Sequence, residues 1–158
     1  MGFLTPEAIL GASDLRTRTV AVPEWGGDLI LGEMSGVDRD DLDAAFLARQ
    51  AAERKAAAAE KRPVNEYAAG EMHAARLIAW TARRPEGGDL FATRKPNGRI
   101  DVAATELVVA KLAARSAVVL SRLLEVANAL NAIGPRALDT AEGNSGGTPG
   151  GLPDGKPA

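Results

Sequence analysis

Hydrophobic and polar residues alternate with a period of two in two short runs near the start of the chain. The apolar residues that share a face within each run are Val20, Val22, Leu29 and Leu31. Between the runs lies the sequence Pro23-Glu24-Trp25-Gly26-Gly27, in which Pro presets φ and the glycines accept positive φ. This pattern predicts a β-hairpin over about residues 17–34. Because a two-stranded hairpin is only marginally stable alone, we expect a helical body to pack against it.

Three later stretches have apolar residues at the spacings of three and four that are typical of helices. They span about residues 36–61, 66–82 and 102–131. The residues that precede them and can cap their N-termini are Ser35, Asn65 and Asp101. The last helix has the clearest apolar stripe, formed by Leu112, Ser116, Val119, Leu120, Leu123, Ala127 and Leu130. Residues 77–80 also fit a short buried strand, and periodicity does not decide between the two interpretations.

The first of these helices changes character along its length. Its early part carries Leu42, Ala45 and Phe46 on one side, whereas the segment from Ala51 to Lys61 is almost entirely Ala, Glu, Lys and Arg. Such a segment has high helix propensity but no apolar stripe. It is therefore more typical of a solvated extension than of a surface for a partner.

The two ends of the chain differ from its body. Thr5-Pro6-Glu7 is a helix start signal, which predicts a short helix through Leu10. Residues 143–158 are mainly Gly, Pro, Ser, Thr and Asp, and they offer too little apolar surface to offset the entropy of ordering. The expected fold class is therefore α+β, with the N-terminal hairpin packed on a mainly helical body. We expect one domain over residues 1–142 and a disordered tail over residues 143–158.

Composition narrows the function classes. Aromatic residues make up only 4% of the chain, so a core of Ala, Leu, Val and Ile is expected, with helices packed through small side chains. A net charge of -2 provides no field to attract nucleic acid or an anionic membrane, and we expect neither partner. The chain has no Cys, which excludes disulfides and thiolate sites. Without a signal-peptide pattern or a long apolar run, the expectation is a soluble intracellular protein.

No stretch of the sequence has the residue pattern of an active site. His73 is the single histidine, and with no second His or Cys a surface or half-buried imidazole is favoured over a metal ligand or a base. The acidic cluster of residues 38–43 suits the positive end of a helix and lacks the spacing and the glycine of a calcium loop. Gly26-Gly27 and Gly87-Gly88 lack the context of a phosphate loop and predict turns. We therefore expect a non-enzymatic protein with no cofactor and no metal.

Several short motifs follow one another in an order that covers most of the chain. The strongest part runs from Leu4 to Phe46 and contains the capped short helix, the Pro-Glu-Trp-Gly-Gly hairpin, and the steps Ser35-Gly36 and Arg39-Asp40. Weaker parts follow at Met72–Trp80, Asp89–Phe91, Leu120–Leu123 and Ala141–Ser145. In this order of motifs the chain resembles the tail assembly chaperones of long-tailed, siphovirus-type bacteriophages. It departs from the family pattern at Ile30, where relatives usually carry a charge, and in a longer Ala-rich segment at residues 51–61.

The resemblance implies a protein that binds the long, largely helical tape-measure protein, keeps it soluble and helps to recruit tail-tube subunits. It also implies action in the host bacterial cytoplasm and absence from the mature virion. Many relatives have a longer second product made by ribosomal frameshifting. A slippery run of G and A can encode Gly155-Lys156, which makes a frameshifted longer form of this chain a further expected partner.

The residues expected to contact a partner lie on the hairpin and on the last helix. They are Val22, Trp25, Ile30, Leu120 and Leu123. For Trp25 two interpretations stay open, because a Trp at a turn tip either folds back over the helices and anchors the hairpin or contacts a partner.

Two other functions also fit parts of the sequence. Apolar residues on both faces of the hairpin fit a structural tail or connector component that stays in the virion and joins a ring by strand addition. Helices that carry Lys and Arg, at residues 49–62 and 76–84, fit a small regulatory or antitoxin-like module. The interspersed acids and the net charge of -2 weigh against the second of these.

Overall fold

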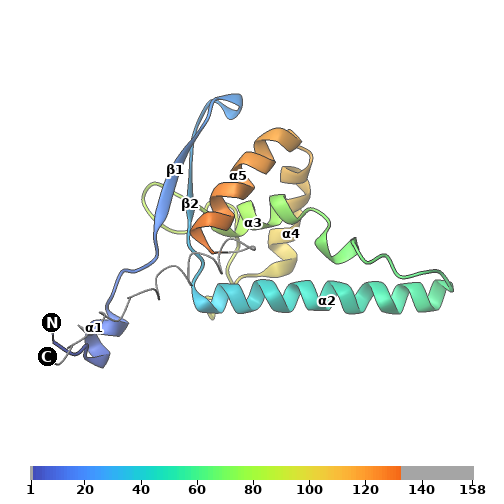
Figure 1. Cartoon of the computed structure of the whole chain (residues 1–158), viewed down its shortest axis with the longest axis horizontal. Helices are drawn as coiled ribbons and strands as arrows, with labels where there is room; N and C mark the ends of the chain where they lie inside the picture. The colour runs from blue at the N-terminus through green and yellow to red at the C-terminus, as the bar shows by residue number, and fades with distance from the viewer. Residues whose placement is uncertain (1, 133–158) are drawn as a thin grey trace, which may run out of the picture.

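The computed structural model describes residues 2–132, which form a hairpin, one long helix and a cluster of shorter helices (Figure 1). The elements in chain order are α1 (Pro6–Leu10), β1 (Thr17–Val22), the 3₁₀ turn η1 (Pro23–Trp25), β2 (Gly27–Gly32), α2 (Gly36–Glu60), the 3₁₀ turn η2 (Ala68–Gly70), α3 (His73–Thr81), β3 (Ala82–Arg83), α4 (Val102–Ala113) and α5 (Ala117–Leu130). The hairpin rises from the N-terminal end of α2, and α3, α4 and α5 lie beside it (Figure 1). The predicted α+β fold class is confirmed.

The hairpin forms as the sequence predicts. β1 pairs with β2 in antiparallel register, so that Val22 lies opposite Gly27 across the turn. The turn closes through Gly26, whose φ of 80° is left-handed and therefore favours a residue without a Cβ. Leu29 and Leu31 share the buried face of β2, as the alternation indicates.

A third strand, β3, extends the sheet and was not predicted. It follows α3 directly and pairs antiparallel with β2, placing Arg83 opposite Ile30 and Ala82 opposite Leu31. The strand order is β1-β2-β3, so β2 is central and β1 is an edge strand. Ile30, which a two-stranded hairpin would leave exposed, is half-buried in the larger sheet.

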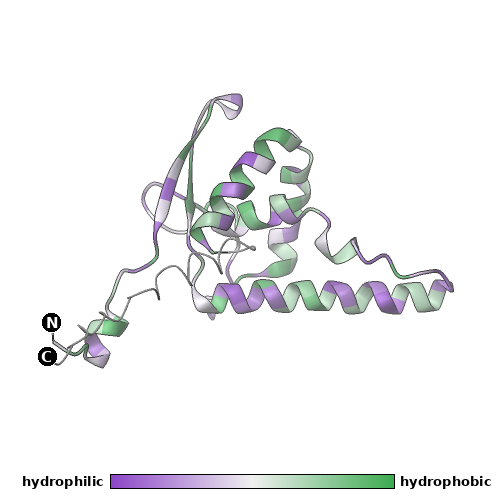
Figure 2. Ribbon diagram, viewed as in Figure 1, coloured by the Kyte–Doolittle hydropathy of each residue, from purple (hydrophilic) through white to green (hydrophobic). Residues whose placement is uncertain are grey.

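α3 lies at the centre of the core. Every residue from Ala75 to Thr81 is buried, and the side chain of Trp80 has no exposed area. α4 and α5 both pack against α3, and each supplies a fully buried residue, Val109 from α4 and Leu123 from α5. The apolar character of these three helices is visible in Figure 2. Residues 77–80, for which the sequence fits both helix and strand, are helical.

The long helix α2 starts where the sequence predicts. The Ser35 hydroxyl accepts a hydrogen bond from the backbone N–H of Asp38 at 3.1 Å, which caps the first turn. Most of the second half is exposed, in agreement with the predicted extension. One face of it is covered, however, because the chain after α2 returns along the helix (Figure 1). Ala57 is buried there, and Arg62 pairs with Glu53 at 2.5 Å.

The helix predicted over residues 66–82 is wrong over its first seven residues. Asn65 does not cap a helix, because its side-chain oxygen accepts from the N–H of Tyr67, only two residues on, at 3.0 Å. This local turn competes with helix formation. The 3₁₀ turn η2 ends at Gly70, and Met72 adopts a left-handed φ of 56° before α3 begins.

The single helix predicted over residues 102–131 is also wrong, because the chain breaks between α4 and α5. Asp101 caps α4 as expected, through the N–H of Ala104 at 3.1 Å. The ψ of 123° at Ser116 leaves the helical region and redirects the chain. A straight helix of this length would extend far beyond the nine-residue α3 at about 1.5 Å per residue. The break allows both halves to pack against α3.

The expected tail at residues 143–158 and the dipeptide Gly155-Lys156 lie outside the described residues. Among the helices of residues 2–132, none combines the length and the apolar content needed to cross a bilayer.

Candidate protein-interaction surface

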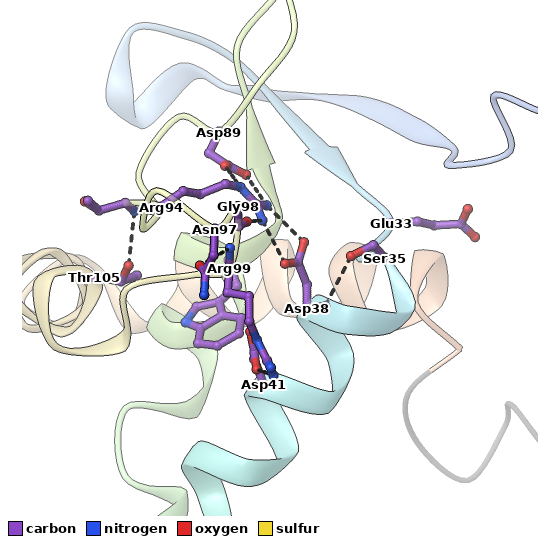
Figure 3. A network of polar contacts seen from close by, with 12 residues as sticks. Glu33, Ser35, Asp38, Asp41, Asp89, Arg94, Asn97, Gly98, Arg99 and Thr105 are labelled. Atoms are coloured by element: carbon purple, nitrogen blue, oxygen red, sulfur yellow. Dashed lines mark hydrogen bonds and ion pairs between the residues drawn. The ribbon is translucent and has the colours of Figure 1, made fainter. Parts of the chain in front are cut away.

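A chain of arginine and aspartate side chains fixes the loop of residues 84–101 to the start of α2 (Figure 3). Arg94 forms two hydrogen bonds with the carboxylate of Asp38, at 2.9 and 3.0 Å. Arg94 also pairs with Asp89, which accepts from Arg83 at 3.0 Å. Hydrogen bonds to Asp38 and Asp89 raise the pKa of Arg94, whereas burial lowers the pKa of Arg83. The network therefore joins α2, β3 and the loop into one charged unit.

A second ion pair holds the far end of the loop. Arg99 pairs with Asp41 on the next turn of α2, and its hydrogen bond lowers the pKa of the Asp41 carboxyl (Figure 3). The backbone N–H of Thr93 donates to the buried hydroxyl of Thr105 at 3.1 Å, which ties the loop to α4. Asp38 and Asp41 at the start of α2 are therefore both paired with arginines of the loop. Within residues 2–132, no group of three or more His, Asp or Glu side chains is placed to hold a metal ion.

The anchored loop and α2 enclose an open groove of about 510 Å³, which we call the α2 groove. Its α2 wall consists of Asp41 and of small residues, and the other wall comes from the loop and the start of α4. The lining residues are Asp41, Ala44, Ala45, Ala48, Lys95, Asn97, Arg99, Ile100 and Val102. Ala44 and Ala48 are exposed. Side chains this small allow another helix to approach α2 closely.

A smaller hollow of about 100 Å³, the Phe46 pocket, lies on a different face of α2. Its lining residues are Arg39, Leu42, Asp43, Phe46, Arg49, His73 and Arg76. The guanidinium of Arg49 lies 6.0 Å from the centre of the Phe46 ring. Arg76 is buried and paired with Glu106 at 2.6 Å. Desolvation lowers the pKa of His73, with further contributions from the cations Arg76 and Arg49.

The structure places the five predicted contact residues mainly in the interior. Val22, Leu120 and Leu123 are buried in the core, so their side chains are already used in internal packing. Trp25 is half-buried and packs against the core. The neighbouring Glu24 pairs with Arg122 of α5 at 2.9 Å, which holds the hairpin tip to the helices. Anchoring of the hairpin is therefore the role of Trp25 that the structure supports.

The two most exposed large apolar side chains of the described residues, Phe3 and Leu10, lie before the hairpin. We call residues 3–10, which include α1, the N-terminal arm. Its exposed apolar residues are Phe3, Leu4, Ile9 and Leu10. The arm projects past the N-terminal end of α2, away from the helical body (Figure 1). No residue of α1 is buried.

Comparison of the chain with protein-family models, with curated proteins and with solved structures gives no match.

The sequence contained signals for the N-terminal arm and for the α2 groove. None of the predicted contact residues lies on either of these two surfaces. Four large apolar residues occur within the eight positions of the arm, around a short helix with a clear N-terminal cap. They do not continue into an apolar stripe of helical spacing. Alanines at positions 44, 45 and 48 recur at helical spacing on α2. Nothing in the sequence indicated the loop wall of the α2 groove, because the ion pair that positions the loop joins Arg94 to Asp38, 56 positions away.

Proposed function

We propose that this protein is a tail assembly chaperone of a long-tailed phage, which binds the tape-measure protein without catalysis. Two lines support the proposal. The first is the order of motifs from Leu4 to Phe46 and their weaker continuation. The second, which carries the structural part of the argument, is the open α2 groove. A groove walled by small side chains suits a helical partner, which inserts its apolar residues along one face.

In this proposal the α2 groove covers part of the apolar stripe of a tape-measure helix before tail-tube subunits assemble around it. Lys95 on the loop side of the groove would face acidic residues that flank such a stripe. Ordering and desolvation costs keep the affinity of one small groove modest, which would let tube protein displace the chaperone. The protein would act in the host cytoplasm, help to recruit tail-tube subunits and be absent from the virion. A frameshifted longer form would share the same groove.

The first test is co-expression with the tape-measure protein of the same phage, followed by pull-down and a comparison of solubility. We expect a soluble complex with the wild-type chain. Ala48→Arg places a long charged side chain in the α2 groove and should reduce recovery of the complex by about tenfold, equivalent to ~1.4 kcal/mol. Ala52→Arg is the matched control, because Ala52 is an exposed α2 residue outside the groove. Equal recovery with both variants would refute the groove as the binding site.

A structural tail or connector component is the second candidate, and the position of β1 favours it. β1 is an edge strand, and its residues from Thr17 to Thr19 are exposed. An exposed edge can accept a further strand from another subunit. Mass spectrometry of purified particles separates the two candidates. Stoichiometric peptides from this chain would support the structural role, and their absence would support the chaperone.

A further inference from the structure

Within residues 2–132, the N-terminal arm is an apolar segment without an internal partner. Thr5 caps α1 by accepting from the N–H of Ala8 at 3.2 Å, and Pro6 occupies the first turn. A helix of five residues is not stable alone in water. Fixing the backbone of its first turn costs more conformational entropy than the few hydrogen bonds of that turn offset. The side chains of Phe3 and Leu10 are 105% and 87% exposed. Apolar side chains gathered in this way are typical of an interaction site.

The chain is fixed to the body at Arg16, six residues after the arm ends. The N–H of Arg16 donates to the carboxylate of Glu33 at 2.8 Å, and the N–H of Glu33 donates to the carbonyl of Arg16 at 2.8 Å. The Arg16 guanidinium also reaches the carbonyl of Leu130 at 3.4 Å. From this anchor the arm extends outward rather than back over the helices (Figure 1). The exposed side chains of residues 3–10 are therefore accessible to another molecule.

The Phe46 pocket has the chemistry that complements the arm. Phe46 and the buried Leu42 supply apolar surface. The cationic or titratable groups that line the pocket are Arg39, Arg49, His73 and Arg76, and its one acidic residue, Asp43, is paired with Arg39 at 3.8 Å. The Nε of Arg49 donates to the carbonyl of Ala69 at 3.1 Å, and within residues 2–132 this guanidinium has no ion pair. At about 100 Å³ the pocket is well below the ~300–1,000 Å³ of small-molecule sites. It suits one or two apolar side chains beside a carboxylate.

We propose that the Phe46 pocket binds the N-terminal arm of a second copy of this chain. Ile9 and Leu10 supply the apolar side chains, and Glu7 supplies the carboxylate that faces Arg49 and His73. Reciprocal exchange of the arms gives a two-fold symmetric dimer, in which each copy contributes the same two surfaces. The inference does not depend on the proposed phage function.

The test uses the full chain and measures its mass in solution by sedimentation velocity over a range of concentrations. The protomer is 16.4 kDa, and we expect a concentration-dependent dimer. Ile9→Asp and Glu7→Arg should each weaken dimerisation at least about tenfold. These arm variants leave the fold intact, because no residue of α1 is buried. Asp14→Arg is the matched control for Glu7→Arg, since it makes the same charge change at an exposed residue outside the arm.

A charge exchange provides the second readout. Arg49→Glu should weaken dimerisation, and combining it with Glu7→Arg should restore most of the loss. A chain that is monomeric at all concentrations would overturn the proposal, as would a dimer insensitive to Glu7→Arg and Ile9→Asp. Hydrogen exchange of the wild-type chain distinguishes docking of the arm on a second copy from docking of the arm on its own body. Protection of the arm amides in a monomer would show that the arm returns to its own body, which would also overturn the proposal.

Discussion

Replacement of Arg94 by Gln tests whether the charged network determines the stability of the fold. In the wild-type protein the Asp38 carboxylate is 4% exposed and its hydrogen bonds come from Arg94. Removing one partner of a buried pair costs about 3–5 kcal/mol, because the other charge stays buried. Two features reduce this value here. Arg94 is 34% exposed, and the N-terminus of α2 stabilises the Asp38 charge by about 0.3–1 kcal/mol. We therefore expect a loss of about 2–3 kcal/mol.

The assay is urea unfolding followed by tryptophan fluorescence, for which the fully buried Trp80 is a suitable probe. Asp38→Asn in the same chain removes the uncompensated charge, so the double variant should be more stable than the sum of the two single losses predicts. Arg84→Gln is the matched control, because Arg84 is an exposed arginine in the same loop as Arg94. A loss below about 0.5 kcal/mol for Arg94→Gln, or strictly additive losses in the double variant, would refute the reasoning.

Three further expectations follow from burial, backbone conformation and ionisation. Leu123→Ala should cost about 2–5 kcal/mol in the free energy of unfolding, measured by urea titration. The control is Val118→Ala in the same helix, which should change that free energy by no more than about 0.5 kcal/mol because the Val118 side chain is 75% exposed. Gly26→Ala should cost about 1–2 kcal/mol in the same assay, because φ is 80° while the space for a Cβ is free. Arg62 lowers the pKa of Glu53 to about 2, so the stability from this pair is complete above the ordinary value of 4.5 and is lost as the pH falls through about 2. Arg62→Ala should raise the Glu53 pKa toward 4.5, measured by NMR titration, and an unchanged value would contradict the assignment.

Most of the local signals in the sequence predicted the local structure, and the cap expected at Asn65 is the exception. The hairpin turn depends on Pro23 and Gly26, and the starts of α2 and α4 depend on Ser35 and Asp101. Each of these residues acts within about four positions of itself, through a fixed φ or a side-chain cap. The physical cause of each element was therefore contained in a short stretch of sequence.

Features that depend on distant partners were not predictable in the same way. The apolar stripe from Leu112 to Leu130 continues through Ser116, so its spacing gives no indication of the break that packing on α3 imposes. β3 exists because Ala82 and Arg83 meet β2, more than fifty positions earlier in the chain. Burial of Leu123 likewise depends on α3, so one apolar stripe alone fits both a core and a binding face.

The central position of α3 has a consequence for synthesis on the ribosome. α3 is buried at every position from Ala75 to Thr81, yet two of the helices that cover it, α4 and α5, come later in the chain. Between the synthesis of Thr81 and of Leu130 the ribosome adds about fifty residues, which takes roughly 2–10 s at ~5–20 residues per second. During that interval the nascent chain exposes the buried surface of α3. Early release of the polypeptide in this window would leave a fragment prone to aggregation, because no shorter N-terminal segment contains the partners of α3.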